Sequence, residues 1–478
     1  MPCQFITREG MNLKPPFLEP LEYQEPEHRN RLRAQTFLLR SRPSVLGGPR
    51  ARALLRKDHP LGSAMGNLGV VVVGAGTGGL SLAHGLRAEG VEVRVFERDR
   101  TPVDRTQGYR LTINANGARA LQSCLPKTNF GHYLEASAKI STAVSFFDHR
   151  LHRLLSIELP TTSQFAPDGA RPISRIALRR ILLEGLEDAV EFGKTFEAFG
   201  TTTQGRIRAR FEDGSSAEGD VLVGADGASS RVRRQLLPQA QRIDTGLIGV
   251  SGRLPLQTIA RGEIPAALFE GPTLILGPRG GFMFAGAVEY PQEHHDGYDP
   301  EEYVMWGFSA RRATLGLKTA SDDISGEAAR AAVLAQMSDW SNDLRRLVER
   351  AEKTSLTTFA VKSSVPIEPW TTSRVTLLGD ALHNMTPFRG IGANTALRDA
   401  ALLRDALRDV DNDQQLLPAL ASYEREMIRY GFMAVRASLA QMRRLHAESP
   451  ISRLATKAFF RLADLSPALQ KRMLDVGD

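Results

Sequence analysis

The chain has 478 residues, of which 42% are hydrophobic and 24% charged, a composition typical of a globular protein with two or three domains. Its net charge of +7 comes mostly from the first 64 residues, which hold 11 Lys and Arg against 6 Asp and Glu. The remainder is nearly neutral, so the charge argues against a nucleic-acid-binding face. The two cysteines, Cys3 and Cys124, form neither a metal-binding spacing nor a disulfide framework, which favours a reducing compartment, the cytoplasm.

Residues 1–66 form a basic leader that differs from the rest of the chain. Between Arg29 and Lys57 there are nine basic residues and no acid. Such a segment is typical of an organelle transit peptide, but the acidic stretch between Glu19 and Glu27 weakens that interpretation. We expect a disordered leader or a gene start at Met65, and we expect a chain beginning at Met65 to fold and function.

The stretch from Val70 to Glu97 is predicted to be a buried strand, a glycine turn, a helix and a second strand that ends in an acid. Gly74 permits the tight turn, Gly76 lets the backbone approach a pyrophosphate, and Gly79 lets the helix pack on the strand. Glu97 follows Gly79 by 18 residues, where a carboxylate can accept both ribose hydroxyls of an adenosine. The stretch therefore indicates FAD or NAD rather than NADP. Its glycine content makes a transmembrane helix a poor alternative.

A second motif begins with an apolar strand that ends in Asp226-Gly227. The strand delivers these residues to a turn, and Ser229 can cap the basic helix that follows. On its own this pattern indicates only a strand, a turn and a capped helix.

A third motif places Gly379-Asp380 at the end of another buried strand. The carboxylate can accept a ribityl hydroxyl, and the glycines at 390 and 392 open a helix that runs to Leu407. The N-terminus of such a helix stabilises an anion by about 0.3–1 kcal/mol when exposed and up to about 2 kcal/mol when partly buried. An anionic reduced flavin would use that helix end.

The three motifs, in this order, resemble the single-component FAD-dependent monooxygenases of the p-hydroxybenzoate hydroxylase type, over about residues 68–440. Shorter matches agree: Gly108 to Leu111 after the second strand, Arg175 to Arg179 opening a helix, and Tyr423 to Glu426 near the C-terminus. The resemblance implies a set of FAD-binding positions: Gly74, Ala75, Gly76, Gly79, Glu97, Gly108, Arg110, Arg175, Asp226, Asp380, Gly392, Ala393 and Asn394. Asp226-Gly227 would also support the visiting NADPH or NADH.

The resemblance implies an α/β fold, namely a Rossmann-like FAD-binding domain with an inserted, mostly β substrate domain and a helical C-terminus. We place the FAD-binding domain at residues 67–245 and 366–410, the substrate domain at 246–365, and the C-terminal helices at 411–478. Residues 140–170 belong either to the first of these or to the substrate sheet.

The implied reaction is a monooxygenation in which NADPH or NADH reduces FAD and one atom of O2 passes to an electron-rich small molecule. A phenol, a polyketide-derived ring, an indole or an alkene would each suit. The alternative is a flavin-dependent reductase or dehydrogenase on the same fold. A disulfide reductase needs a cysteine pair, and a halogenase of related type carries a Trp-x-Trp element; the sequence has neither. No catalytic residue, metal cluster or membrane span stands out, and the oligomeric state is left open.

Three further features have structural interpretations. His383 has no evident partner that would tune it, so we interpret it as a hydrogen-bonded structural histidine. Phe282-Met283-Phe284 is predicted to be a core strand, of which at most one face meets a ligand. The amphipathic tail from Ile451 to Leu474 is expected to pack against the body of the protein rather than on a membrane.

Overall fold

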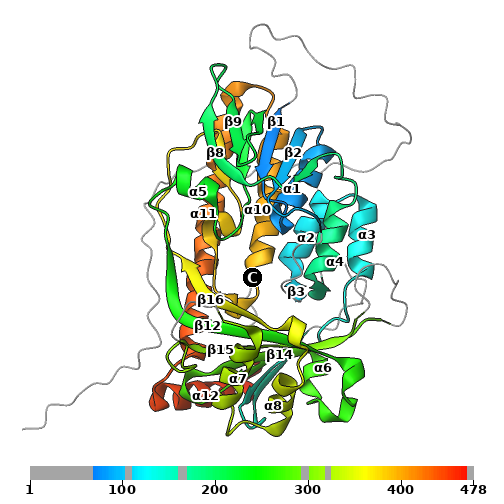
Figure 1. Cartoon of the computed structure of the whole chain (residues 1–478), viewed down its shortest axis with the longest axis vertical. Helices are drawn as coiled ribbons and strands as arrows, with labels where there is room; N and C mark the ends of the chain where they lie inside the picture. The colour runs from blue at the N-terminus through cyan, green and yellow to red at the C-terminus, as the bar shows by residue number, and fades with distance from the viewer. Residues whose placement is uncertain (1–67, 103–109, 160–168, 292–300, 318–323, 471–478) are drawn as a thin grey trace, which may run out of the picture. The chain divides into compact units, whose positions relative to one another are not determined.

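A computed structural model of the chain describes residues 68–102, 110–159, 169–291, 301–317 and 324–470. The leader at residues 1–66 and the predicted site residue Gly108 lie outside these ranges. The described residues fold into four sheets with helices packed around them (Figure 1).

A five-stranded parallel sheet has the order β17-β11-β1-β2-β7. Its strands are β1 (Gly69–Val73), β2 (Glu92–Glu97), β7 (Val190–Phe192), β11 (Val221–Gly224) and β17 (Val375–Leu377). Every residue of β1, β11 and β17 is buried, as expected for apolar strands in a parallel sheet that is covered on both faces. Val70 pairs with Val221, and Leu222 pairs with Val375. The three strands that precede the three motifs are therefore neighbours, and their carboxyl ends lie at one edge.

Helices surround this sheet and share one large apolar core with it. They are α1 (Thr77–Ala88), α2 (Ala115–Cys124), α3 (Lys127–Glu135), α4 (Arg175–Leu183), α5 (Arg231–Leu236), α9 (Asp380–His383), α10 (Gly392–Arg408) and α11 (Asp413–Leu445). Helix α10 packs against α1, α2 and α11, so the third motif is held against the helix of the first (Figure 1).

Two small antiparallel sheets accompany the parallel one. The first contains β8 (Phe196–Thr201), β9 (Ile207–Phe211) and β10 (Ser216–Gly219). The second pairs β3 (Arg110–Ile113) with β6 (Arg171–Ser174), and it sets Arg110 opposite Ser174. This short pair matters for the site because α4 starts directly after β6.

A seven-stranded sheet has the order β16-β12-β15-β14-β13-β4-β5. Its strands are β4 (Ala143–Asp148), β5 (Arg153–Glu158), β12 (Arg242–Pro255), β13 (Thr273–Leu276), β14 (Phe282–Val288), β15 (Tyr303–Arg311) and β16 (Thr357–Ser364). It is antiparallel except for the parallel pair of β13 and β4.

Short helices connect or cover these strands: α6 (Ala267–Glu270), α7 (Gly326–Gln336), α8 (Asn342–Glu349), and the 3-10 turns η1 (Leu256–Thr258), η2 (Arg261–Glu263), η3 (Pro278–Gly280), η5 (Lys353–Ser355) and η6 (Pro387–Arg389). The sheet face that carries Met283 and Trp306 shares a core with residues of α7 and α8. Phe282 and Phe284 lie on the opposite face and belong to a different apolar cluster. The alternation along β14 therefore places its two phenylalanines on the face opposite Met283.

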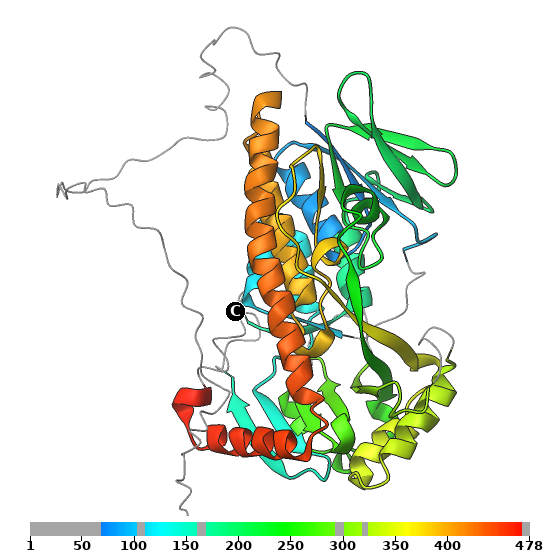
Figure 2. The same cartoon turned by 90° about the vertical axis from the view of Figure 1, so that its left-hand side faces the viewer.

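The last helix, α12 (Pro450–Asp464), follows the long α11 (Figure 2). Phe460 stacks on Phe146 of β4 with ring centroids 4.5 Å apart. Helix α12 packs against β5 of the body, as expected, with Phe460 and Ala463 buried. Part of its apolar side is nevertheless uncovered, because Ile451, Leu454 and Leu462 are 81%, 70% and 63% exposed. Periodicity predicted the helix correctly but gave no information about which side is covered. Among the described residues, no helix is long and apolar enough to cross a membrane.

Candidate functional site

The three sequence motifs converge at the carboxyl edge of the parallel sheet. A Cβ added to Gly74 would lie 2.4 Å from the carbonyl oxygen of Ala225, so the first motif touches the second. The backbone N–H of Leu378 donates to the Gly224 carbonyl at 3.0 Å, which joins the second motif to the third. A Cβ on Gly78 would lie 2.3 Å from Leu378 Cδ2, so the first motif also touches the third. One site is therefore built from three distant segments.

The glycine turn is tight on its inner side and open on its outer side. Gly74 has φ +111°, a region that side chains avoid, and its N–H donates to the Phe96 carbonyl at 2.8 Å. A Cβ on Gly79 would lie 2.1 Å from the Gly74 carbonyl oxygen, whereas one on Gly76 would have no atom within 4 Å. Helix α1 begins here without a side-chain cap. An uncapped helix N-terminus beside the open side of Gly76 is the arrangement that a pyrophosphate requires.

Glu97 is 5% exposed and its carboxylate holds the glycine turn directly. Oε2 accepts the backbone N–H of Ala75 at 2.7 Å, and Oε1 accepts that of Asp99 at 3.0 Å. Each carboxylate oxygen has a second lone-pair site, so both hydroxyls of a ribose can still be accepted. The sequence indicated the acid but not its bond to the turn.

Asp226 uses one carboxylate oxygen for the fold and leaves the other without a protein partner. Oδ2 accepts the backbone N–H of Arg231 at 2.7 Å, at the start of α5. Oδ1 is buried and has no partner among the described residues. The expected cap by Ser229 is wrong by one position: Ser230 is the N-cap, and its Oγ accepts the N–H of Arg233 at 2.8 Å. A run of two serines does not reveal which one takes the cap geometry.

Asp380 and Gly392 of the third motif lie next to each other. Gly379 adopts φ +64° and turns the chain out of β17. A Cβ on Gly392 would lie 3.9 Å from Asp380 Oδ1 and 3.8 Å from a Met385 carbon, so little protein crowds this point. Asp380 is exposed, and α10 starts at Gly392 without a side-chain cap. A carboxylate acceptor and a free helix N-terminus therefore sit side by side.

Asn394 joins this helix start to β3. Its Nδ2 donates to the Thr112 carbonyl at 2.9 Å, and its Oδ1 accepts the N–H of Asn114 at 2.9 Å. Asn394 is 4% exposed. Its amide thus positions β3, which carries Arg110, against the start of α10.

Arg110 and Arg175 take different environments. Arg110 is 8% exposed and points its guanidinium at β14, where Nη1 donates to the Ala287 carbonyl at 3.3 Å. Arg175 is exposed at the first position of α4, after Ser174, which caps that helix. The paired strands β3 and β6 bring the two arginines to the same end of the site.

His383 has a partner that the sequence did not reveal. Its Nε2 lies 2.7 Å from Oδ2 of Asp399, and the same oxygen accepts the N–H of Gly379 at 2.7 Å. The Tyr430 hydroxyl donates to the other oxygen of Asp399. Burial alone would lower the pKa of His383, but the Asp399 carboxylate raises it above the ordinary value of 6.5. Asp399 lies on the face of α10 that turns toward β17, a placement that helical spacing alone does not specify.

An aromatic cluster lies where the η6 turn meets β14. The Phe388 ring centroid is 5.7 Å from that of Phe282 and 4.7 Å from that of His446. His446 is 2.8 Å from Ser309 Oγ, and burial lowers its pKa to about 4, so it stays neutral. Phe284 lies two positions after Phe282 on β14 and is only partly buried. The Arg110 guanidinium carbon lies over the Phe284 ring, 5.8 Å from the ring centroid. Phe284 therefore lies beside Arg110, whereas Phe282 packs against Phe388.

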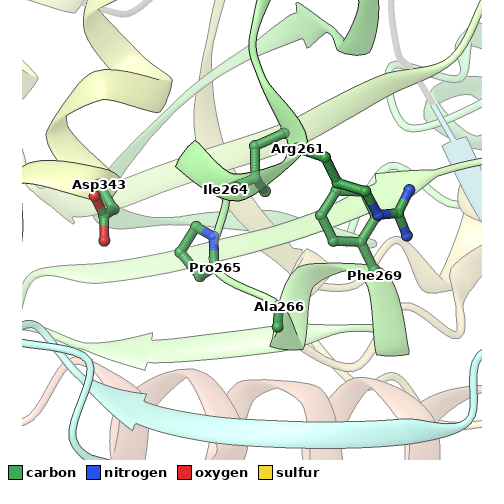
Figure 3. Close-up of a pocket in the computed structure, with 7 residues that line it drawn as sticks. Arg261, Ile264, Pro265, Ala266, Phe269 and Asp343 are labelled. Carbon is green, nitrogen blue, oxygen red and sulfur yellow. The ribbon is translucent and has the colours of Figure 1, made fainter.

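A hollow of about 560 Å³ lies elsewhere on the seven-stranded sheet part (Figure 3). It is lined by Arg261, Gly262, Ile264, Pro265, Ala266, Phe269 and Asp343. Arg261 stacks over Phe269 at 3.8 Å and is paired with Glu289. None of the lining residues belongs to the three motifs, so this hollow is separate from the site described above. Among the described residues, no group of three or more His, Cys, Asp or Glu side chains could hold a metal ion.

Known proteins with similar sequences bind FAD or are named as FAD-dependent monooxygenases. The family model described as FAD binding domain matches residues 67–438. The 3-amino-4-hydroxybenzoate 2-monooxygenase PtnB3 of Streptomyces platensis is 30% identical over 373 residues, covering 74% of this chain and 83% of that protein. The dual O-methyltransferase/FAD-dependent monooxygenase elcB of Phaeosphaeria nodorum is 30% identical over 421 residues, covering 78% of this chain and 45% of that protein. The chain thus spans less than half the length of this dual-function relative.

Solved structures agree with these sequence matches. A putative FAD-containing monooxygenase from Photorhabdus luminescens is 33% identical, with a TM-score of 0.71 over 80% of this chain and 100% of that one. HpxO of Klebsiella pneumoniae, solved with FAD and uric acid, is 22% identical with a TM-score of 0.70 over 86% of this chain and 96% of that one, and it supports the fold alone. The α/β fold expected from the motifs is confirmed.

Proposed function

Because the chain belongs to the FAD binding domain family of FAD-dependent monooxygenases, we propose that it uses NADPH or NADH and O2 to insert one oxygen atom into an electron-rich small molecule. The observation that carries this proposal is the convergence at one sheet edge of an uncapped helix, the buried Glu97 carboxylate and the Asp380–Gly392 pair. Bound FAD supplies the redox chemistry, namely hydride acceptance and O2 activation. The protein's own residues bind and orient the cofactor and the substrate, and they exclude water from the site.

The predicted binding residues have separate roles in this proposal. The open side of Gly76 and the α1 N-terminus receive the pyrophosphate, with Gly74, Ala75 and Gly79 shaping the turn. Glu97 accepts the adenosine ribose hydroxyls. These assignments rest on the tight inner packing of the turn and on the open space, among the described residues, where a Cβ on Gly76 would lie.

The other half of the site would hold the ribityl chain and the ring. Asp380 accepts a ribityl hydroxyl, while the uncapped start of α10 at Gly392, Ala393 and Asn394 faces the ring, where its dipole favours negative charge. The unpartnered Oδ1 of Asp226 lies at the junction of the first two motifs and supports FAD or the visiting nicotinamide nucleotide. Gly108, Arg110 and Arg175 complete the proposed set.

The substrate we propose is a hydroxylated aromatic ring. A relative of which the chain covers 83% is named for a hydroxylated aminobenzoate, and the dual-function relative elcB joins a monooxygenase to an O-methyltransferase. The partly buried ring of Phe284 offers a stacking surface on the site-facing side of β14. In this proposal, the Phe284 side of the run predicted as a core strand contacts the ligand.

The test is the fate of oxygen. The purified protein, loaded with FAD, is reduced anaerobically by NADPH or NADH with and without a panel of phenols, polyketide-like rings, indoles and alkenes. A true substrate should accelerate this anaerobic reduction. In separate turnover under labelled O2, its product should carry one atom from O2 and none from the solvent water. A product that is desaturated or reduced without label would contradict the monooxygenase and favour a reductase or dehydrogenase.

A further inference from the structure

Helix α12, drawn in red in Figure 2, has two apolar faces, and the body of the protein covers only one of them. Phe460 and Ala463 are buried against the strands β4 and β5. Around the helix these two side chains point about 200° and 140° away from Ala458, so the face that carries Ala458 is turned outward. The exposed apolar residues of the outward face, which we call the apolar stripe, are Ile451, Leu454, Ala458, Leu462 and Leu465.

The stripe is the main concentration of exposed apolar side chains on the described part of the chain. Ten large apolar side chains are exposed among the described residues, and five of them lie between Ile451 and Leu465. The two end residues are the most exposed of all, at 81% and 82%. Single exposed apolar residues are ordinary on a protein surface, but a contiguous patch marks an interaction site.

The stripe is symmetric around Ala458. Ile451 and Leu465 lie seven residues before and after it, and Leu454 and Leu462 lie four residues before and after it. All four lie within about 40° of Ala458 around the helix, at about 10 Å and 6 Å along its axis. A two-fold axis at Ala458 therefore places an antiparallel copy with Ile451 opposite Leu465 and Leu454 opposite Leu462. Self-complementarity of this kind is what a two-fold symmetric interface between identical chains requires.

The centre and the ends of the stripe also suit an antiparallel copy. The small side chain of Ala458 lets two helix axes approach to about 8–10 Å. Phe459, which is 47% exposed, lies on one flank beside the two-fold axis, where the rings of the two copies would meet. The helix begins at Pro450 and ends at Asp464, so antiparallel pairing sets the N-terminus of each copy near the C-terminus of the other, where the helix dipoles attract.

A lipid surface is the alternative occupant, and the charges of α12 favour a second copy. A helix that lies on a membrane carries many exposed Lys and Arg side chains along its polar side. In α12, which the structure describes in full, Lys457 is paired with Asp148 at 3.6 Å and Nη1 of Arg453 is buried. Arg461 is the one basic residue of this helix that is exposed. The polar side of α12 is therefore largely occupied by the body of the protein.

We propose that the apolar stripe of α12 binds the apolar stripe of a second copy of this chain, in an antiparallel helix pair with two-fold symmetry. A single helix buries less than the standard interface of about 800 Å² per partner, so the dimer should be reversible, with a dissociation constant of about 1–100 µM. Helix α12 packs on β5, the outermost strand of the seven-stranded sheet. The pair thus joins the two copies at that edge of the sheet.

Charge exchange tests the pairing of individual residues. Leu454→Lys and Leu462→Glu each place a charge in the stripe, and each should weaken self-association of the FAD-loaded full chain by at least about 10-fold. Leu454→Lys/Leu462→Glu should recover most of this loss, because position 454 of each copy lies opposite position 462 of the other. Within one helix the two positions are about 12 Å apart, too far to pair.

Two matched controls accompany these variants. Leu454→Lys/Leu462→Lys carries charges at the same positions without complementarity and should stay monomeric. Met433→Lys, at a 55% exposed position of α11, should associate like the wild type. Sedimentation velocity between about 1 and 200 µM gives the dissociation constants. The FAD content and the thermal midpoint of each variant, measured at a concentration where all are monomeric, should equal those of the wild type, because the substituted side chains are exposed.

A cysteine on the two-fold axis gives an independent test of the geometry. In a Cys3→Ser background, where Cys124 is buried, Ala458→Cys should form an intermolecular disulfide under mild oxidation. Ala455→Cys, also exposed on α12, should not, because its two copies would lie about 9 Å apart along the helix axes.

A wild type that stays monomeric up to about 200 µM would overturn the proposal, as would association that Leu454→Lys leaves unchanged or that the charge exchange does not restore. Flotation of monomeric wild type with phosphatidylserine vesicles, weakened by salt, would assign the stripe to a lipid surface instead, since salt screens that attraction but not an apolar contact. Association by a chain that begins at Met65, but not by the full chain, would assign it to the leader. None of these results bears on the proposed oxygen transfer.

Discussion

The side chains of His383 and Asp399 form a buried ion pair, with Nε2 and Oδ2 2.7 Å apart and the two side chains 1% and 0% exposed. The pair lies one turn from the exposed Asp380 carboxylate, and through the N–H of Gly379 it also fixes the glycine that turns the chain out of β17. We therefore regard His383 as a positioning residue for the third motif, not as a base.

The pair predicts a pH-dependent stability. Burial opposes protonation, but Asp399 raises the pKa of His383 above 6.5. A raised pKa in the folded state stabilises the protein fully below pH 6.5, and this contribution is lost as pH rises through the raised value. The stability advantage of wild type over His383→Gln should thus be largest at acidic pH and shrink at alkaline pH.

Asp399→Asn should cost about 3–5 kcal/mol near neutral pH, because one charge of a buried pair is left alone. Chemical denaturation across pH 5.5–9 checks both variants in the same buffers. His152→Gln is the control, since His152 pairs with Asp148 while 66% exposed. An advantage of wild type that grows with pH would contradict a charged His383.

Glu97 should be required for FAD retention. Glu97→Ala removes the acceptor for the Ala75 N–H and for the ribose, and loss of a charged acceptor costs about 1.5–3 kcal/mol, or about 10- to 150-fold in FAD affinity. Glu92→Ala, at the exposed start of the same strand, should bind FAD like the wild type. Equilibrium titration of apoprotein with FAD gives both values. Equal FAD affinity of the two variants would show that Glu97 does not bind FAD.

Alanine variants of Gly76 and Gly79 should affect FAD binding and folding, respectively. Gly76 has φ −85° and no atom near an added Cβ, so Gly76→Ala should fold normally but obstruct the pyrophosphate and weaken FAD binding. Gly79→Ala would place a carbon 2.1 Å from the Gly74 carbonyl oxygen, so it should lower the thermal midpoint of the apoprotein. Thermal melts of apoprotein and FAD titrations of both variants give the comparison. Undiminished FAD binding by Gly76→Ala would contradict the pyrophosphate assignment.

Glu424 should destabilise the protein as pH rises. It is 3% exposed, Thr372 donates to it at 2.6 Å, and burial raises its pKa from 4.5 to about 7. An acid with a raised folded-state pKa binds its proton more tightly when folded, so stability falls between about pH 4.5 and 7 and is level above. Glu424→Gln should therefore gain about 2–3 kcal/mol over wild type at pH 8 and little at pH 5.

Denaturant unfolding at the two pH values measures that gain. Glu426→Gln, two positions along the same helix, removes an exposed partner of Arg429 and is the matched control. A gain that is the same at pH 5 and pH 8 would show that Glu424 is ionised in the folded protein.

Local patterns predicted the parts of the site that depend on backbone geometry. The glycine turn, the strand ends at Asp226 and Asp380, and the acid at Glu97 each follow from short-range constraints on turns and strands, and the structure brings these residues together at one edge. The α/β fold followed from the same constraints together with the family resemblance.

Side-chain partners across elements were not predictable in this way. Asp399 contacts His383 from the neighbouring helix α10, and Arg110 reaches β14 from a strand that Asn394 joins to the start of α10. Which side of α12 is exposed depends likewise on the elements that pack against it. The spacing of apolar residues such as Ile451 and Leu462 is the same whether or not another element covers them. These features depend on tertiary packing, which a periodicity does not specify.

The parallel sheet has a consequence for how the chain is made. Gly69 at the start of β1 donates to Asp220, 151 positions later, and β11 in turn pairs with β17, which begins at Val375. The valines of β1 therefore leave the ribosome long before β11, which pairs with them on one side, is synthesised. Such non-local pairing folds slowly and leaves apolar strands exposed to aggregation. Recombinant synthesis should therefore gain more from slower translation and from chaperones that hold nascent chains than from a stronger promoter.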